Sequence, residues 1–312
     1  MLTVILETYD GERYQLPMLV EWDLTHTGSV PCDSMAVTCL YDQGMSDVLP
    51  RATRFAARSG GATMLRGVVD AYEISFSPQG MLVTVEGRGM AALLLDNESE
   101  AITYGRASLA DILQNHVTPY GVSTEVRREV SGRNYAVVSG SSQWKALRGF
   151  THRYGGFEPY FTREGGLVAG PLWGSGRTLR INDETPLLSL RKREQRYGVI
   201  SEMLIQDKVQ GVSHSVVNED FAAQGGRRRH VLYMPRSTAG QRRYTGEYQI
   251  AQSELERLEI SLELPLAFAA SPGDRVSLSL SRLGLSGTYD VVSARSRMDG
   301  SGERTEMTLS VR

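Results

Sequence analysis

Cysteine is scarce in this sequence, because the 312 residues include only Cys32 and Cys39. These two lie seven residues apart, and so on opposite faces of any strand that joins them, which argues against a disulfide framework or a closed metal site. The five histidines are scattered, and none lies in an H-E-x-x-H motif or a Cys/His cluster. No carboxylate pair has a sequence context that would hold it across a cleft. We therefore predict no catalytic residue, no metal site and no bound cofactor.

Long apolar runs are also missing. No stretch approaches the roughly 18 to 20 residues that span a bilayer, so we expect no membrane insertion. A phosphate-binding glycine loop is absent as well, since GRGM at 87–90 is only a fragment of G-x-G-x-x-G. The formal net charge of −2 argues against bulk attraction to nucleic acid or to an acidic membrane. What remains, 41% hydrophobic and 22% charged residues, suffices for a core in two or three domains.

Alternating apolar residues dominate positions 1–97. LTVILET alternates from Leu2, and a second run places Val20, Trp22 and Leu24 on one face. Gly60-Gly61 separates two further runs and is typical of a tight hairpin. We predict that residues 1–97 form a first, tube-like antiparallel β-barrel.

The period changes to that of a helix after residue 97. Ser108 followed by Asp111 fits a capping box ahead of the apolar face Leu109, Ile112, Leu113 and Val117. A second helix carries Trp144, Leu147, Thr151 and Tyr154 and ends at Gly155-Gly156, where a left-handed cap is favoured. We assign residues 98–188 to an α/β middle domain.

Strand patterns return in residues 189–312, which we assign to a second tube-like β-barrel with one helical insertion near 241–257. Its final hairpin turns at Asp299-Gly300. Leu285, Gly287 and Asp290 repeat the spacing of Leu65, Gly67 and Asp70, and each triplet begins a long strand, turn and strand. The repeat indicates two similar barrels or arises by chance. The predicted fold class is mainly β, with two barrels joined by a helix-containing α+β domain.

Two segments have more than one interpretation. The basic run Arg227, Arg228, Arg229 and His230 follows two glycines, and it is either a loop facing the lumen or a partner, or a mobile solvated loop, with nucleic-acid contact a third reading. The aromatic run Tyr154, Phe157, Tyr160 and Phe161 is either a sugar-stacking platform or part of the core. Core packing is favoured for the aromatic run.

Family-like motifs occur in a fixed order along the chain. The hairpin in Leu65–Asn97 leads into Gly87, Arg88, a leucine-rich stretch and Asp96, and a helix beginning SLADIL follows. RYGGFEPYF comes at 153–161, and PGDRV with the terminal hairpin comes at 272–312. In this order the sequence resembles the baseplate hub proteins of contractile phage tails, of the late-control D, Mu and PBSX types.

The resemblance implies a homotrimer without enzymatic activity. Each subunit would contribute two barrels to a pseudo-sixfold ring, which adapts a hexameric tail tube to a trimeric central spike. The implied partners are the tube protein, the spike protein and other baseplate proteins, with DNA or a tape-measure protein passing through the lumen. The implied location is the baseplate of a virion or tail-like particle, assembled in the host cytoplasm. Contractile and non-contractile tails, phages and tailocins all fit.

Two other functions remain open. One is a tail-associated cell-wall hydrolase, which needs a reactive cluster that the sequence does not reveal. The other is a tail-tip protein that binds a receptor or carbohydrate, which needs the aromatic run to be exposed.

Overall fold

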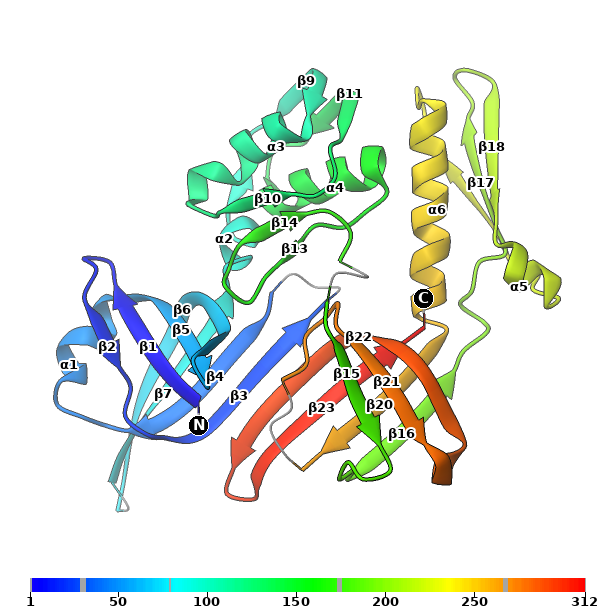
Figure 1. Cartoon of the computed structure of the whole chain (residues 1–312). Coiled ribbons are helices and arrows are strands. Elements are labelled where there is room, and N and C mark those ends of the chain that lie inside the picture. Colours follow the sequence, from blue (N-terminus) through cyan, green and yellow to red (C-terminus); the bar gives the residue numbers. More distant parts are fainter. Residues whose placement is uncertain (1, 29–31, 79, 173–175, 266–268, 312) are drawn as a thin grey trace.

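The computed structural model describes residues 2–28, 32–78, 80–172, 176–265 and 269–311. Most of its secondary structure is β, and one large, mainly antiparallel sheet is built from both ends of the chain. A helix-containing part lies above the middle of this sheet (Figure 1). The predicted fold class, mainly β with an α+β middle part, is confirmed.

The N-terminal part of the chain forms the first half-sheet, in the order β3-β4-β7-β6-β5-β1-β2. Its elements are β1 (Leu2–Thr8), β2 (Arg13–Gln15), β3 (Leu19–Thr27), β4 (Ser34–Leu40), α1 (Met45–Val48), η1 (Leu49–Arg51), β5 (Ala52–Ser59), β6 (Ala62–Ser77) and β7 (Gly80–Gly89). Alternate side chains from these strands bury a core around Phe55, Leu6 and Val83. Gly60 and Gly61 both have positive φ between β5 and β6, which confirms the predicted tight hairpin.

In this half-sheet, the prediction that Val20 lies on the same face as Trp22 and Leu24 is wrong. Val20 is 37% exposed, whereas Leu19, Trp22 and Leu24 are buried. The reason is a register shift in the β3/β4 pair between Leu19 and Glu21. A bulge inserts one residue and moves the alternation to the other face, so simple period-2 counting fails there.

The C-terminal part forms the second half-sheet, in the order β16-β20-β23-β22-β21-β15. Its strands are β15 (Thr178–Asn182), β16 (Ser189–Glu194), β20 (Leu258–Leu264), β21 (Arg275–Leu280), β22 (Leu285–Asp299) and β23 (Gly302–Ser310), with η3 (Ser281–Leu283) between β21 and β22. They bury a second core that includes Ile260, Val276 and Leu309. β15 belongs to the stretch that we assigned to the middle domain from sequence, yet it pairs with β21.

The two half-sheets have the same strand order. We number the strands of each half-sheet from one to six by their order in the chain and leave aside the short β2. Both half-sheets then have the spatial order 2-3-6-5-4-1. The long strands β6 and β22, which carry the Leu-x-Gly-x-x-Asp repeat, take the same place in each. One pairing differs, because β1 is antiparallel to β5 whereas β15 is parallel to β21. The sequence repeat therefore marks a repeated topology.

The half-sheets join through β22 and β3. Residues Ser293–Met298 of β22 pair antiparallel with Trp22–Thr27 of β3, so the strands from β16 to β6 form one continuous path. Figure 1 shows this path crossing from the orange and red strands to the blue ones. Met298 packs against the core of the first half-sheet, so the junction is apolar as well as hydrogen-bonded.

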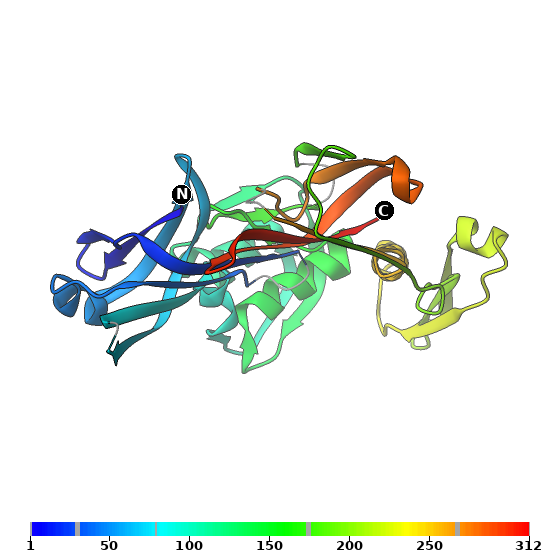
Figure 2. The same ribbon diagram turned by 90° about the horizontal axis from the view of Figure 1, so that it is seen from below.

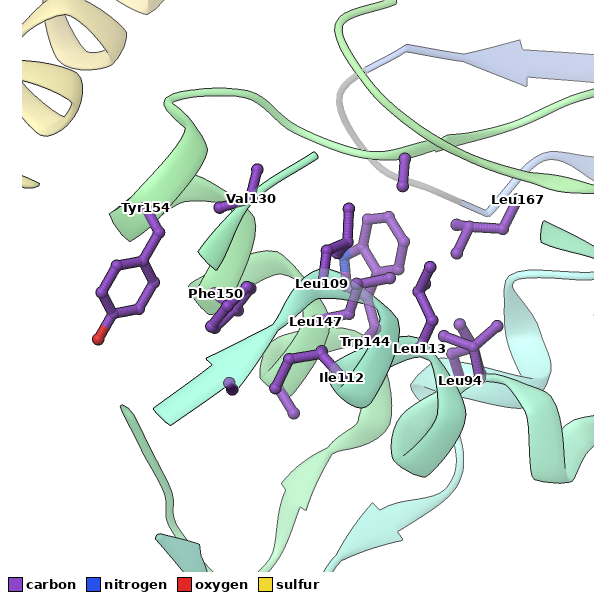
Figure 3. Packing of buried hydrophobic residues seen from close by; sticks show 14 of the residues in the cluster. Leu94, Leu109, Ile112, Leu113, Val130, Trp144, Leu147, Phe150, Tyr154 and Leu167 are labelled. Carbon is purple, nitrogen blue, oxygen red and sulfur yellow. The ribbon is translucent and has the colours of Figure 1, made fainter. Parts of the chain in front are cut away.

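The middle part follows the first half-sheet. Its elements are α2 (Ala92–Leu95), β8 (Glu98–Ser99), β9 (Ile102–Ser108), α3 (Leu109–His116), η2 (Thr118–Tyr120), β10 (Thr124–Val126), β11 (Ser131–Val137), β12 (Ser141–Ser142), α4 (Gln143–Gly155), β13 (Tyr160–Phe161) and β14 (Leu167–Ala169). The predicted capping box of Ser108 and Asp111 begins α3, and Gly156 in the left-handed conformation ends α4. α3 and α4 pack together over Leu109, Ile112, Leu147 and Phe150 (Figure 3).

An insertion separates β16 from β20. It contains β17 (Glu202–Asp207), β18 (Val212–Val217), α5 (Glu219–Ala223), β19 (Arg229–Tyr233) and α6 (Ala239–Leu255). Helix α6 packs on the small sheet β18-β17-β19 and also contacts α4. Figure 2 shows the insertion at the edge of the molecule farthest from the N-terminal half-sheet. No helix in the described part of the chain is long and apolar enough to cross a membrane.

Candidate assembly surfaces

The large sheet has one face that is turned away from both cores. Neighbouring strands are in register here, so alternate residues form rows that cross from β16 to β6. Most of their side chains are charged or carry a hydroxyl: Arg191, Arg193, Glu259, Ser261, Glu263, Glu306, Thr308, Arg304, Ser293, Arg295, Arg297, Asp23, Thr25, Ser34, Thr38, Thr84, Glu86, Arg88 and Glu73. We call this surface the polar face.

Ion pairs cross between strands on the polar face. At the junction of the half-sheets, Arg295 Nε lies 2.9 Å from Asp23 Oδ2. Arg297 contacts Glu306 at 2.9 Å, and Arg304 contacts Glu263 at 3.5 Å. These three arginines thus have carboxylate partners in place, which leaves little unbalanced positive charge at this part of the polar face.

Arg88 extends this pattern at the far side of the junction. Its guanidinium donates to Asp70 at 2.8 Å and to Asp96 at 2.7 Å. Hydrogen bonds from the guanidinium hold the pKa of Asp96 below its usual range. The Gly-Arg and the acidic residue that carry the family resemblance are therefore one ion-pair cluster that ties β7 and β6 to α2.

The basic segment at 227–230 is not wholly a loop, which corrects the sequence interpretation. Arg229 and His230 begin strand β19, where Arg229 ion-pairs with Glu202 of β17 at 2.6 Å. Arg228 lies over the Tyr197 ring and donates to the ring nitrogen of His230 at 3.1 Å. Residues 228–230 are therefore held by strand pairing and by these side-chain contacts. Arg227 and Arg228 precede the strand, and a partner-facing role for the segment stays a prediction.

The aromatic run at 154–161 lies mostly in the interior. Tyr154 and Phe157 are buried in the core of the middle part, and Tyr160 and Phe161 are half-buried in β13. Tyr154 donates its hydroxyl hydrogen to the Arg133 carbonyl at 2.7 Å, and its ring packs on Phe150. Core packing, the favoured interpretation, holds for Tyr154 and Phe157.

A charged cluster that no sequence pattern indicated joins the middle part to helix α6. Glu158, just after α4, pairs with Arg148 at 2.6 Å and accepts a hydrogen bond from the Tyr248 hydroxyl of α6 at 2.8 Å. His152 lies 3.5 Å from the same carboxylate and stacks against the Tyr248 ring. Burial raises the pKa of Glu158, but the nearby His152 ring, the Arg148 charge and the Tyr248 hydroxyl together lower it below its usual value.

A cavity of about 560 Å³ lies where the middle part meets both half-sheets. Two pairs of its charged residues are in contact: His26 lies 3.1 Å from Asp33, and Arg177 lies 3.0 Å from Asp274. Among the described residues no group of three histidine, cysteine or acidic side chains could hold a metal ion. Burial raises the pKa of Cys32 and of Cys39 to about 11, so both thiols stay protonated at neutral pH.

Comparison with known proteins adds the relatives of this fold. A scan of protein-family models and a search of curated proteins find no match. A solved tail protein from Neisseria meningitidis MC58 matches at a TM-score of 0.80 and 15% identity, over 99% of this chain and 96% of the other. This chain has the fold of phage tail proteins.

Two further structures share the tail-protein fold. The 43 kDa tail protein of prophage MuSo2 from Shewanella oneidensis matches at a TM-score of 0.74 and 16% identity, over 99% of this chain and 98% of the other. The E. coli c3393 protein is a component of the type VI secretion system described as similar to T4 bacteriophage tail proteins gp27 and gp5. It matches at a TM-score of 0.55 and 11% identity, over 94% of this chain and 73% of the other. The family resemblance seen in the sequence is confirmed at the level of the fold.

Proposed function

We propose that this chain is a non-enzymatic hub protein of a phage tail or related particle, and that three copies form its ring. The observation that carries the proposal is the repeated strand order of the two half-sheets. One chain supplies two equivalent units, so three chains supply the six that match a hexameric tube, while the chain itself repeats three times and matches a trimeric spike. The likeness to solved tail proteins supports the same role.

The polar face supports a channel in this ring. A wall that a moving DNA or tape-measure chain passes must be hydrated and must not bind it, and cross-strand ion pairs meet both needs. In the proposed assembly the polar face lines the lumen, and the two apolar cores lie behind it. The tube, the spike and other baseplate proteins are the proposed partners, in a baseplate assembled in the host cytoplasm.

The middle part and the insertion have a different proposed place. Both lie off the continuous sheet path, and the Glu158 cluster ties them together (Figure 2). We propose that they point away from the channel towards peripheral baseplate proteins, with Arg227, Arg228, Arg229 and His230 on the side that meets a partner.

Light scattering coupled to size-exclusion chromatography, at rising protein concentration, tests the trimer. A mass three times that of the chain is expected. A reconstruction of the particle should place three copies on its axis, and copies found away from the axis would contradict the proposal. A zymogram with host cell walls provides the enzymatic test, and clearing would replace the hub with the hydrolase.

A further inference from the structure

Strand β6 has two parts with different neighbours. Its first part pairs with β5 up to Val68, whereas Ala71–Phe76 pair only with β7. Within the described chain, no strand lies along the other side of Ala71–Phe76. A free strand edge of this length can pair with another chain.

Apolar side chains mark the same free edge. Tyr72, Ile74 and Phe76 alternate along it and are 41%, 42% and 81% exposed. They lie on the face of the sheet that Val83 and Val85 turn towards the core of the first half-sheet. An apolar row beside open backbone groups is a hazard for a protein that stays alone, and it suits a surface that another strand covers.

Strand β22, the counterpart of β6, shows how such an edge is covered. Its first part pairs with β21, as β6 pairs with β5, and its second part pairs with β3. At this internal junction Ala294 is 2% and Ser296 is 9% exposed. Ile74 lies seven residues after Gly67, and Ala294 lies seven residues after Gly287. Because β6 and β22 each contain one register shift, Ile74 corresponds to Ala294. The chain thus contains a covered version of its own uncovered edge.

Strand β16 is the counterpart of β3 and is also free on one side. Ser189–Glu194 pair only with β20 within the described chain. β16 and β6 lie at opposite ends of the continuous path, so they do not meet within one molecule. Arg191, Lys192 and Arg193 make β16 basic and have no ion pair among the described residues, whereas Glu73 and Glu86 lie on or beside the free edge of β6. Opposite charges of this kind favour association of the two edges.

We propose that residues 192–197, which are the end of β16 and the segment after it, pair antiparallel with residues 73–78 on and just beyond the free end of β6 in the next copy, in the manner of the internal β3–β22 junction. This inference rests on the trimeric ring proposed above and names the strands that close it. Each copy uses one edge for one neighbour and a different edge for the other, so the contact is heterologous. Such contacts form a closed ring when the rotation from one copy to the next is a whole fraction of a full turn. The apolar row of β6 then covers the open end of the core of the second half-sheet.

The internal junction also gives the register. Trp22 of β3 and Lys192 of β16 are matched positions, because the paths Val85–Val37–Trp22 and Leu309–Ile260–Lys192 cross the two half-sheets alike. Thr25, opposite Arg295 at the internal junction, then corresponds to Gln195, and Arg295 corresponds to Ser75. Ser75 of one copy therefore faces Gln195 of the next.

A cysteine pair tests this contact. In the full chain with Ser75→Cys and Gln195→Cys, mild oxidation should give covalent dimers and trimers on a non-reducing gel, because opposed Cα atoms in antiparallel strands lie about 4.5–5.5 Å apart, within disulfide range. Each single variant should stay monomeric on the gel. The control pair Ser75→Cys with Ser189→Cys, six residues out of register, should crosslink far less.

The outcomes separate this inference from the trimer itself. A trimer seen by light scattering without a Ser75–Gln195 crosslink would overturn the strand pairing and leave the hub proposal standing. Efficient crosslinking of the control pair alone would also overturn it. If neither the trimer nor the crosslink forms, even at protein concentrations about 100-fold above those of a gel-filtration run, both the trimer proposal and the strand pairing are overturned.

A charge substitution gives a second readout that does not depend on disulfide geometry. Phe76→Asp should shift the trimer to monomer, since it puts a charge into the apolar row, and it should leave the thermal midpoint of the monomer unchanged because Phe76 is exposed. Tyr9→Asp, at a side chain that is 73% exposed near β1, is the matched control and should stay trimeric. Trimers of Phe76→Asp as stable as those of the control would contradict the pairing.

Discussion

Leu147 of α4 has no exposed surface in the core that α3 and α4 build (Figure 3). Leu147→Ala removes three buried carbon atoms and leaves a cavity, so we expect the free energy of unfolding to fall by about 2–5 kcal/mol. Urea denaturation followed by circular dichroism measures this. Lys145→Ala on the exposed side of the same helix is the control and should change the free energy by less than about 0.5 kcal/mol. Equal losses for the two variants would contradict the placement of the core.

Glu158 makes stability depend on pH. Its pKa in the folded protein lies below the ordinary value of 4.5, so its contribution is fully present above pH 4.5 and is lost as the pH falls through the folded pKa. Glu158→Gln should therefore be less stable than the natural chain at pH 7, and the difference should shrink towards pH 3. Urea titrations at both pH values measure it. Glu256→Gln, at an exposed carboxylate just after α6, is the control, and a difference that does not change with pH would contradict the prediction.

At the scale of elements, local signals were enough where contacts are local. The Ser108–Asp111 capping box, the Gly60-Gly61 turn and the left-handed Gly156 each depend on residues within a few positions, and the sequence predicted all three. The β3–β22 junction joins Asp23 to Arg295 across almost the whole chain, and nothing in either local pattern indicates it. The bulge that exposes Val20 depends on the partner strand β4 and was missed for the same reason.

The candidate surfaces follow the same division. The leucine-glycine-aspartate repeat predicted two related strands, but their free and covered edges depend on which strands lie beside them. The sequence showed a basic run at 227–230, whose Arg229 proves to be ion-paired within a strand. The sequence did not indicate the polar face. Alternation within one strand shows that the strand has a polar side, but it does not show that eight neighbouring strands turn their polar sides the same way.

The balance of charge on the polar face can be tested by removing its acids. Glu263→Gln with Glu306→Gln frees Arg297 and Arg304 from their partners, so binding of a short duplex DNA should become on the order of tenfold tighter at 50 mM salt and fall steeply as salt rises. Fluorescence anisotropy measures the affinity. Glu184→Gln with Glu219→Gln makes the same change of net charge at exposed sites that have no ion pair among the described residues, and this control should bind DNA as the natural chain does. Equal gains for the two double variants would mean that net charge alone matters.

At the scale of the whole molecule, the architecture is a repeated sheet with additions at two points. The middle part lies between the two half-sheets in the chain, and the insertion lies within the second half-sheet, between β16 and β20. Neither addition interrupts the path from β16 to β6. Size and surface chemistry of the two additions can therefore vary between such proteins without altering the continuous sheet.

The β3–β22 junction has a mechanical consequence for a ring of three chains. Six seams would alternate around it, and three of them join strands that belong to the same polypeptide. Strands at those three seams stay tethered by one polypeptide even when the pairing opens, so only the other three seams can release a subunit. Failure under tension would release whole subunits, each still carrying its pair of half-sheets.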